Sequence, residues 1–453
     1  MKKKVLSMIL ATAMVATMVA GCGNKDAGTD TASEGKETTT ETTKAEEKTD
    51  TKDEGTGGKE KLTFYHAYYH DEATWPAAVA MREIYQEFAD AHANDDCTFE
   101  AVPVEDVTEL ATNELAGGTF PNMVDFAGME VPLAAISQGL VLDMKDYIDK
   151  EGLESKVGIN YTMNQVDGKI YTVHDQLTTL GLWYNADLYE AAGATTPDTW
   201  TNYEDMAAAM NAITTYGSSK GIYAYSAGQG SIRLFNAYMG LLNKEYASGA
   251  LTADIINSDE FATAFKAIAA MDQANGSANT SDDVGSFSSD VTSGLCATFL
   301  NGVWGAGSFT DTDINMKPAI YPGNVSLSAP GGGLTIAADL SDAQKALALE
   351  FVKYMTSDEV QQKIFLEINA NPCNTDLDLT ALAEGSDNAT VKLLAEACSL
   401  ANSAKTIVST TNYVWGADVQ TAIINKLIEC SVSGTDIDAK LAELQGELVA
   451  LIG

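Results

Sequence analysis

Strands alternate with helices along most of this chain, and this order limits the folds that the chain can adopt. Residues 61–69 are rich in aromatic and β-branched side chains, which predicts a strand. Apolar residues then recur at i, i+3, i+4 and i+7 within 81–88, which predicts an amphipathic helix. A second strand at 98–104 and a helix at 106–115 repeat the unit. The sequence therefore predicts an α/β fold whose mainly parallel sheets are flanked by helices.

The segment from residue 61 to residue 453 is too long for one ordinary hydrophobic core. Single cores seldom grow beyond about 250–300 residues, so we expect two lobes. Later strands are expected at 169–173, 180–184 and 334–338. In open α/β sheets, ligands bind beyond the carboxyl ends of the strands. The loops that follow the strands are therefore the first places to look for a site.

Residues 1–21 have the features of an export signal. Three lysines precede an apolar run at 5–20, which is shorter than the ~20 apolar residues of a membrane-spanning helix. The run leads into Val-Ala-Gly-Cys, which ends at Cys22. This pattern resembles a bacterial lipobox, in which the cysteine is acylated and becomes the new N-terminus. The alternative is an ordinary signal peptide followed by a chance cysteine.

Residues 22–60 are predicted to form a disordered tether. From residue 23 onward they contain no Val, Ile, Leu, Met or aromatic residue, and they are rich in Thr, Lys and Glu. Such a segment cannot bury enough apolar surface to offset its chain entropy. We therefore expect a lipoprotein of the Gram-positive type, held at the outer face of the cytoplasmic membrane only by the lipid on Cys22.

Charge and cysteine content exclude several other classes of protein. A formal charge of −37 is the wrong sign for binding nucleic acid through its phosphates. The four histidines show no metal-type spacing, and no metal or other cofactor is expected. The cysteines beyond Cys22 are expected to be buried, and one disulfide is possible although its pairing is undetermined. These cysteines are Cys97, Cys296, Cys373, Cys398 and Cys430.

Four stretches resemble the family 1 extracellular solute-binding proteins of the maltose-binding type, which deliver substrates to ABC importers. The first is 115–124, where Asn122 replaces the Asp that is usual in the family. The second runs from Val-Asp-Gly-Lys-Ile-Tyr at 166–171 to Pro-Asp-Thr-Trp at 197–200. The third is 294–304, and the fourth is 331–338 with the helix that follows it.

This resemblance implies a monomeric, two-lobed binding protein of the type II periplasmic fold, without catalytic residues. Lobe 1 would comprise 61–175 and 330–375, and lobe 2 would comprise 176–329 and 376–453. The chain would cross the hinge several times, and a solute held between the lobes would stabilise the closed form. The permease subunits of an ABC transporter would then recognise that form.

The expected site residues are those suited to a sugar, which needs aromatic rings for its apolar faces and polar side chains for its hydroxyls. The ligand-binding candidates are Tyr68, Tyr69, His70, Trp75, Glu130, His174, Asp175, Gln176, Arg233, Trp304, Tyr413 and Trp415.

Several of these candidates have a structural alternative. Trp304 occupies the family's stacking tryptophan position, but it could instead be a core residue between the lobes. Tyr413 and Trp415 lie near another aromatic position of the family, with helix packing as the alternative. His174 stands where the family commonly has Pro, in a segment that could be a solvated turn. Arg233 could donate to hydroxyls or pair with the carboxylate of an acidic sugar.

The interpretation that follows is capture of a carbohydrate, an oligosaccharide in the first instance, for an ABC importer. A protein of the same fold could bind a non-sugar solute such as a polyamine, a phosphodiester or a metal complex. A surface glycoside hydrolase or esterase is the alternative from another class, and turnover of a glycan would distinguish it. A sensor subunit would have the same sequence features as an importer subunit.

Overall fold

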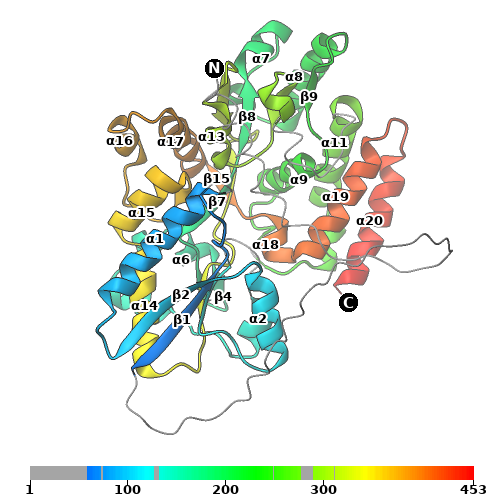
Figure 1. The fold of residues 1–453 in the computed structure, drawn as a ribbon. Coiled ribbons are helices and arrows are strands. Elements are labelled where there is room, and N and C mark those ends of the chain that lie inside the picture. The colour runs from blue at the N-terminus through cyan, green and yellow to red at the C-terminus, as the bar shows by residue number, and fades with distance from the viewer. Residues whose placement is uncertain are drawn as a thin grey trace, which may run out of the picture.

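The computed structural model describes residues 59–72, 75–126, 132–247, 249–276, 289–310 and 312–452. These residues form two packing units joined by a small central sheet (Figure 1). The predicted lipidation residue Cys22 and the predicted site residue Glu130 lie outside the described ranges. Within those ranges, no helix combines the length and the apolar character that crossing a membrane requires.

The first unit is built on a five-stranded sheet. Its strands lie in the order β2 (Cys97–Pro103), β1 (Glu60–His66), β3 (Met123–Asp125), β13 (Leu334–Ile336) and β6 (Thr172–Val173). β1 is parallel to β2 and β3, whereas β13 is antiparallel to its neighbours β3 and β6. The other elements are α1 (Pro76–Ala91), α2 (Val107–Ala116), α3 (Leu133–Ser137), α4 (Lys145–Glu151), α5 (Glu154–Val157), α6 (Asn160–Met163), β4 (Gln165–Val166), β5 (Lys169–Ile170), α14 (Asp342–Met355), α15 (Asp358–Lys363) and the π-helix η4 (Ile364–Ile368).

Local sequence signals account for the helices of this unit. The four apolar residues of the 81–88 repeat are all buried on one face of α1. Asp106 accepts hydrogen bonds from the backbone N–H groups of Thr108 and Glu109 at 2.9 and 2.8 Å, which starts α2 where the sequence predicted. The core of this unit draws on 62–173 and 334–368, so the unit is discontinuous along the chain.

The second unit is built on a four-stranded sheet. Its strands lie in the order β11 (Met316–Ala319), β8 (Leu182–Asn185), β10 (Cys296–Phe299) and β9 (Tyr223–Tyr225). The other elements are α7 (Ala186–Ala192), η2 (Pro197–Thr199), α8 (Tyr203–Gly217), α9 (Gln229–Leu242), α10 (Ala253–Ile256), α11 (Asp259–Asn275), η3 (Val303–Gly305), α13 (Ala306–Phe309), α16 (Leu379–Glu384), α17 (Ala389–Asn402), α18 (Thr411–Trp415), α19 (Ala417–Ser431) and α20 (Ile437–Leu451).

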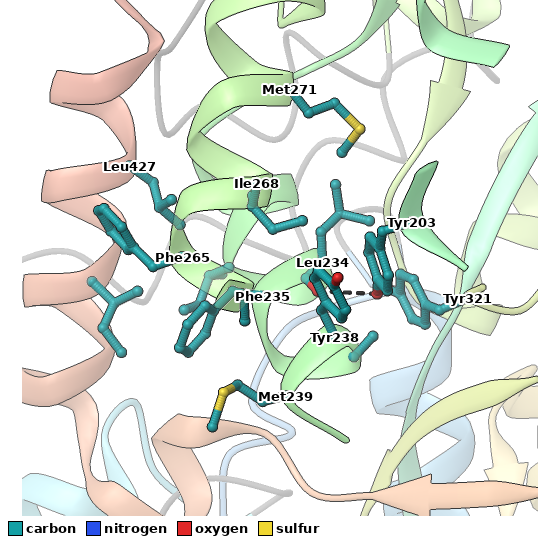
Figure 2. Close-up of a cluster of buried hydrophobic side chains, with 14 of the residues drawn as sticks. Tyr203, Leu234, Phe235, Tyr238, Met239, Phe265, Ile268, Met271, Tyr321 and Leu427 are labelled. Atoms are coloured by element: carbon teal, nitrogen blue, oxygen red, sulfur yellow. Dashed lines mark hydrogen bonds between the residues drawn. The ribbon is translucent and has the colours of Figure 1, made fainter. Parts of the chain in front are cut away.

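The packing of helix α9 is central to the core of this second unit. Figure 2 shows Tyr203 of α8 beside Tyr238 of α9, with parallel rings whose centroids are 4.0 Å apart. The Tyr203 hydroxyl donates a hydrogen bond to the carbonyl of Leu234 at 3.1 Å, so its polar end is also satisfied in the core. These two contacts hold helix α9 against α8, and Arg233 lies on α9 next to Leu234.

A third sheet connects the two units. Its strands lie in the order β14 (Asn371–Pro372), β7 (Gln176–Leu180), β12 (Val325–Ala329) and β15 (Thr406–Val408). β7 follows β6 of the first unit and precedes β8 of the second, and β12 precedes β13 of the first unit. The chain thus passes between the units through this sheet more than once. The α/β fold is confirmed. The prediction of mainly parallel sheets is wrong, because among the described strands only β1–β2, β1–β3, β9–β10 and β12–β15 are parallel pairs. The strands that enter a sheet at a crossing, such as β8 and β13, run antiparallel to their neighbours.

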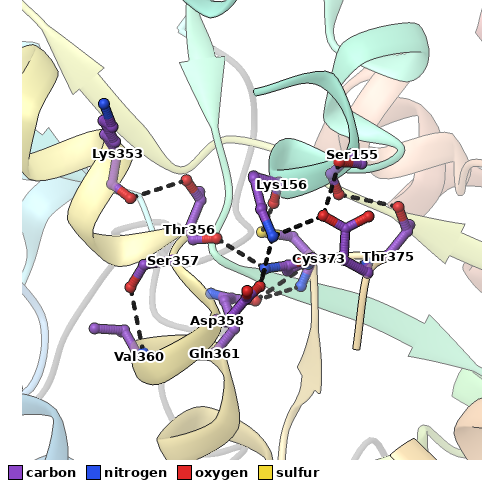
Figure 3. A network of polar contacts seen from close by, with 12 residues as sticks. Ser155, Lys156, Lys353, Thr356, Ser357, Asp358, Val360, Gln361, Cys373 and Thr375 are labelled. Carbon is purple, nitrogen blue, oxygen red and sulfur yellow. Dashed lines mark hydrogen bonds and ion pairs between the residues drawn. The ribbon is translucent and has the colours of Figure 1, made fainter. Parts of the chain in front are cut away.

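A polar network holds the crossing strands against the first unit (Figure 3). The side chain of Gln361 is fully buried and donates to the carbonyls of Asp175 and Met355 at 2.9 and 2.7 Å. Its amide oxygen accepts from the backbone N–H groups of Cys373 and Asn374 at 2.8 and 3.3 Å. Gln361 therefore joins the residue before β7 to the residues after β14.

An ion-pair cluster lies on the surface side of the same network. Lys156 of α5 bridges the carboxylates of Asp358 and Asp376, each at 2.6 Å (Figure 3). Asn374 donates to Asp358 at 2.8 Å and to the Thr356 carbonyl at 3.1 Å. These contacts connect segments more than 200 residues apart in the sequence.

Candidate functional site

Strand β7 brings together three groups of predicted site residues. The amide of Gln176 donates to the hydroxyl of Tyr68 at 2.9 Å. Two residues further along the strand, Thr178 shares a hydrogen bond of 3.1 Å with the Tyr413 hydroxyl. Side chains at i and i+2 of a strand point to the same face, so both contacts lie on one face of β7. At the end of the strand, Leu180 forms a backbone bridge with Gly302, two residues before Trp304.

The loop after β1 contains a cluster of aromatic rings that includes Tyr68. The ring of Tyr68 lies 5.1 Å from that of Trp75, and the rings of Tyr69 and His70 lie 4.1 Å apart. Arg82 of α1 donates to the carbonyls of Tyr68 and His70, both at 2.7 Å, and so fixes the loop. The indole N–H of Trp75 is buried and has no partner among the described residues. The structure thus clusters the four candidates of this loop, and Arg82 is the positioning residue that the sequence did not identify.

The segment before β7 is buried and does not form a solvated turn. Asp175 is completely buried, and burial, with the nearby Asp125 carboxylate, raises the pKa of Asp175 well above its usual value. His174 is also buried, and burial lowers its pKa to about 3, so it is neutral at ordinary pH. The side chain of Asn160 holds the His174 backbone, accepting from its N–H at 2.8 Å and donating to its carbonyl at 2.9 Å. Asn160 carried no recognisable signal in the sequence.

On the second unit, Arg233 and Tyr413 lie near each other beside the loop that carries Trp304. Arg233 donates through Nη1 to the carbonyl of Leu300, and among the described residues it forms no ion pair with a carboxylate. Burial raises the pKa of Tyr413, and the charge of the nearby Arg233 opposes this increase. Trp304 is half-buried in η3.

Trp415 lies deeper than the other aromatic candidates. It is 8% exposed and belongs to the core of the second unit, with its ring edge-on to Tyr246 at 5.5 Å. This packing is the helix-packing alternative for Trp415. Its indole N–H nevertheless has no partner in the described part of the chain. A role for Trp415 in ligand binding remains a prediction.

The predicted cluster does not coincide with the hollows described below. Hollows of about 250 and about 480 Å³ lie between α8 and α11 and beside α16 and α17, and no predicted site residue lines either of them. The five described cysteines are free thiols and all are buried. Across the described ranges, no three His, Cys, Asp or Glu side chains are grouped to hold a metal ion.

Comparisons with known proteins agree on one class. The model for the bacterial extracellular solute-binding protein family matches residues 83–392. A Streptococcus pneumoniae solute-binding protein, solved in complex with the blood group A-trisaccharide, is 45% identical to this chain. The match covers 86% of this chain and 100% of that one, with a TM-score of 0.78.

More distant structures share the fold. A chitin oligosaccharide binding protein is 19% identical, covering 86% of this chain and 98% of its own, with a TM-score of 0.65. A cyclic alpha-maltosyl-1,6-maltose binding protein from Arthrobacter globiformis is 18% identical, covering 87% and 99%, also with a TM-score of 0.65. No protein with a curated description matches the chain.

Proposed function

Because this chain belongs to the bacterial extracellular solute-binding protein family, its function is to bind a solute without catalysing a reaction, and we propose that the solute is an oligosaccharide. The observation that carries the proposal is the 45% identity to the S. pneumoniae protein whose structure holds a trisaccharide. The aromatic and polar side chains gathered around β7 provide the chemistry that a sugar requires.

The two packing units would act as the two lobes of a clamp. We place lobe 1 at 61–175 and 330–375 and lobe 2 at 176–329 and 376–453. Aromatic faces from both lobes, such as Trp75 and Trp304, would stack on the apolar faces of the sugar rings. Polar side chains such as Gln176 would meet the hydroxyls. Solute binding then favours the closed arrangement because only that arrangement makes both sets of contacts.

The unpartnered donors of the site support this assignment. The indole N–H of Trp75 lies in the loop after β1, and it is buried without a hydrogen-bond acceptor among the described residues. Arg233 uses one N–H group on Leu300 and has further N–H groups to donate. A sugar hydroxyl or ring oxygen would supply the missing acceptors, and buried donors are costly when they are left unpaired.

Location and partners follow from the same function. The protein is extracellular, as its family is. Acylation of Cys22 would anchor it to the outer face of the cytoplasmic membrane, and residues 22–60 would be the tether. The permease subunits of an ABC transporter would receive the solute from the closed form, with the binding protein acting as a monomer.

A ligand screen tests the proposal directly. The melting temperature and the tryptophan emission of the purified protein are measured with each compound in turn. The compounds are the blood group A-trisaccharide, chitin oligosaccharides, polyamines and phosphodiesters. A cognate ligand at 100 times its Kd should add ~2.7 kcal/mol to the free energy of unfolding. A response to a polyamine or phosphodiester, with none to any glycan, would overturn the oligosaccharide proposal.

Two variants test the role of Trp304. Trp304→Ala should abolish the response to the cognate glycan while the fold persists. The matched control is Tyr216→Ala, which removes an aromatic ring of α8 that lies against Lys220, away from the site. Glycan affinity at the wild-type level in Trp304→Ala would remove Trp304 from the site.

A further inference from the structure

The ring of Trp304 lies directly over the α-carbon of Gly302. A Cβ atom built on Gly302 would lie 2.2, 2.3 and 2.4 Å from three carbons of the indole ring. Real Cβ atoms do not approach other atoms so closely, so any larger residue at 302 must push the ring away. The backbone of Gly302 has φ −75°, which other residues adopt readily. Glycine is therefore required here for close approach rather than for its backbone conformation.

Hydrogen bonds hold the backbone of Gly302 in place, so it cannot shift to make room for a side chain. Its carbonyl accepts hydrogen bonds from the indole N–H of Trp183 at 2.9 Å and from the N–H of Gly305 at 3.0 Å. Its own N–H donates to the side-chain oxygen of Asn301 at 2.8 Å. Trp183 and Asn301 are both buried, so these anchors belong to the interior of the second unit. The flexible partner in the contact is the side chain of Trp304.

Further contacts tie this loop to helix α9 and to the end of strand β7. Arg233 donates to the carbonyl of Leu300, and Gly230 of the same helix leaves room for the Leu300 side chain. On the other side, Gly302 pairs with Leu180, and the N–H of Gly181 donates to the carbonyl of Asn301 at 3.3 Å. The loop is therefore held from the core of the second unit and from the crossing strand at the same time.

We propose that Gly302 is a positioning residue, which holds the ring of Trp304 in the orientation that binds the solute. It does so because its loop is paired with the end of strand β7. This inference rests on the proposed function, in which Trp304 stacks on a sugar ring. The Trp304 ring packs against Gly302, and Gly302 is paired with Leu180 of β7. The face of Trp304 that would stack on a sugar therefore keeps a fixed position relative to the strand that joins the units. Arg233 helps to hold this loop in place by its hydrogen bond to the carbonyl of Leu300.

The test is a double-mutant cycle between Gly302→Ala and Trp304→Ala, with Gly307→Ala as the matched control. A Cβ on Gly307 meets only an ordinary contact, 3.7 Å from a methyl of Thr390. Affinity is measured by calorimetry with the blood group A-trisaccharide. Gly302→Ala should weaken binding at least tenfold, and Gly307→Ala less than twofold. In the Trp304→Ala background, which should no longer respond to the glycan, Gly302→Ala should change the melting temperature little, because the ring that it displaces is gone.

Fluorescence of the unliganded protein separates this inference from the proposed function. Gly302→Ala should shift tryptophan emission to longer wavelength, because the displaced Trp304 ring becomes more exposed, and the shift should vanish in the Trp304→Ala background. This readout needs no ligand, so it still decides the positioning role if the trisaccharide fails to bind the wild type.

Three outcomes would overturn the inference. One is Gly302→Ala with wild-type emission and wild-type affinity. The second is an equal change in emission or in melting temperature in both backgrounds, which would show that Gly302 does not act through Trp304. The third is a Gly302→Ala protein that fails to fold even when Trp304 is alanine. Failure to fold only when the Trp304 ring is present would instead support the contact.

Discussion

Replacing Gln361 by leucine should destabilise the protein more than its size suggests, because this side chain satisfies four buried backbone groups. The amide donates to the carbonyls of Asp175 and Met355 and accepts from the N–H groups of Cys373 and Asn374. Leucine has a similar volume and makes none of these bonds. The four backbone groups would remain in the interior without their partner.

The expected size of the effect follows from the number of bonds. A typical buried hydrogen bond contributes ~1 kcal/mol net, and an orphaned buried group costs ~1–3 kcal/mol. Four lost bonds therefore predict a loss of about 4 kcal/mol or more. For a folding unit of 150–250 residues, each kcal/mol lowers Tm by roughly 2–4 °C, so the melting temperature should fall by about 10 °C.

Differential scanning calorimetry and urea unfolding of the purified protein measure this change. The matched control is Gln138→Leu, which makes the same substitution at an exposed position after α3. The control should stay within ~0.5 kcal/mol of wild type, as surface substitutions usually do. If Gln361→Leu melts as the control does, then Gln361 does not hold the two crossings of the chain and the reasoning is wrong.

Three other predictions concern pH, thiols and the anchor. The free energy of unfolding should fall as pH drops from 6.5 toward 4. Burial lowers the pKa of His66 to about 4 and that of His174 to about 3, whereas histidines of the unfolded chain take up protons near pH 6.5. In urea titrations, His174→Gln should reduce this slope by up to ~1.4 kcal/mol per pH unit, and an unchanged slope would contradict the assignment. The described cysteines should resist Ellman's reagent in the native protein and react in urea, since all are buried; rapid native reaction would count against this packing. Cys22→Ala should leave the membrane fraction on cell fractionation, and retention at the wild-type level would exclude a lipid anchor there.

The main elements of the fold were predictable because their signals are local. The apolar repeat at 81–88 and the cap at Asp106 each depend on residues within a few positions of one another. Family resemblance added the two-lobed arrangement, since it compares the order of elements over the whole chain.

Strand β7 was only partly predicted. The sequence predicts one strand at 180–184, whereas the structure has β7 at Gln176–Leu180 and β8 at Leu182–Asn185, separated by Gly181. The segment Gln-Leu-Thr-Thr-Leu has little apolar character of its own. Its strand conformation depends on pairing with β12 and β14, which lie about 150 and 195 residues further along the chain.

The site was predictable as a set of residue types but not as a set of contacts. Aromatic residues at strand ends identified the loop with Tyr68 and the loop with Trp304. The residues that position those loops and the His174 segment were missed, namely Arg82, Gly302 and Asn160, because their partners are backbone groups and one ring. Such contacts have no periodicity that a sequence pattern could reveal.

The alternating faces of β7 also constrain how this site can change during evolution. Inserting or deleting one residue inside the strand would exchange its two faces, so Gln176 would turn away from Tyr68 or Thr178 from Tyr413. Strand β7 can therefore contribute to a change in ligand preference only through substitutions, and not through insertions or deletions. The loop at 69–75 carries no such restriction, and it can lengthen or shorten without turning the strand over.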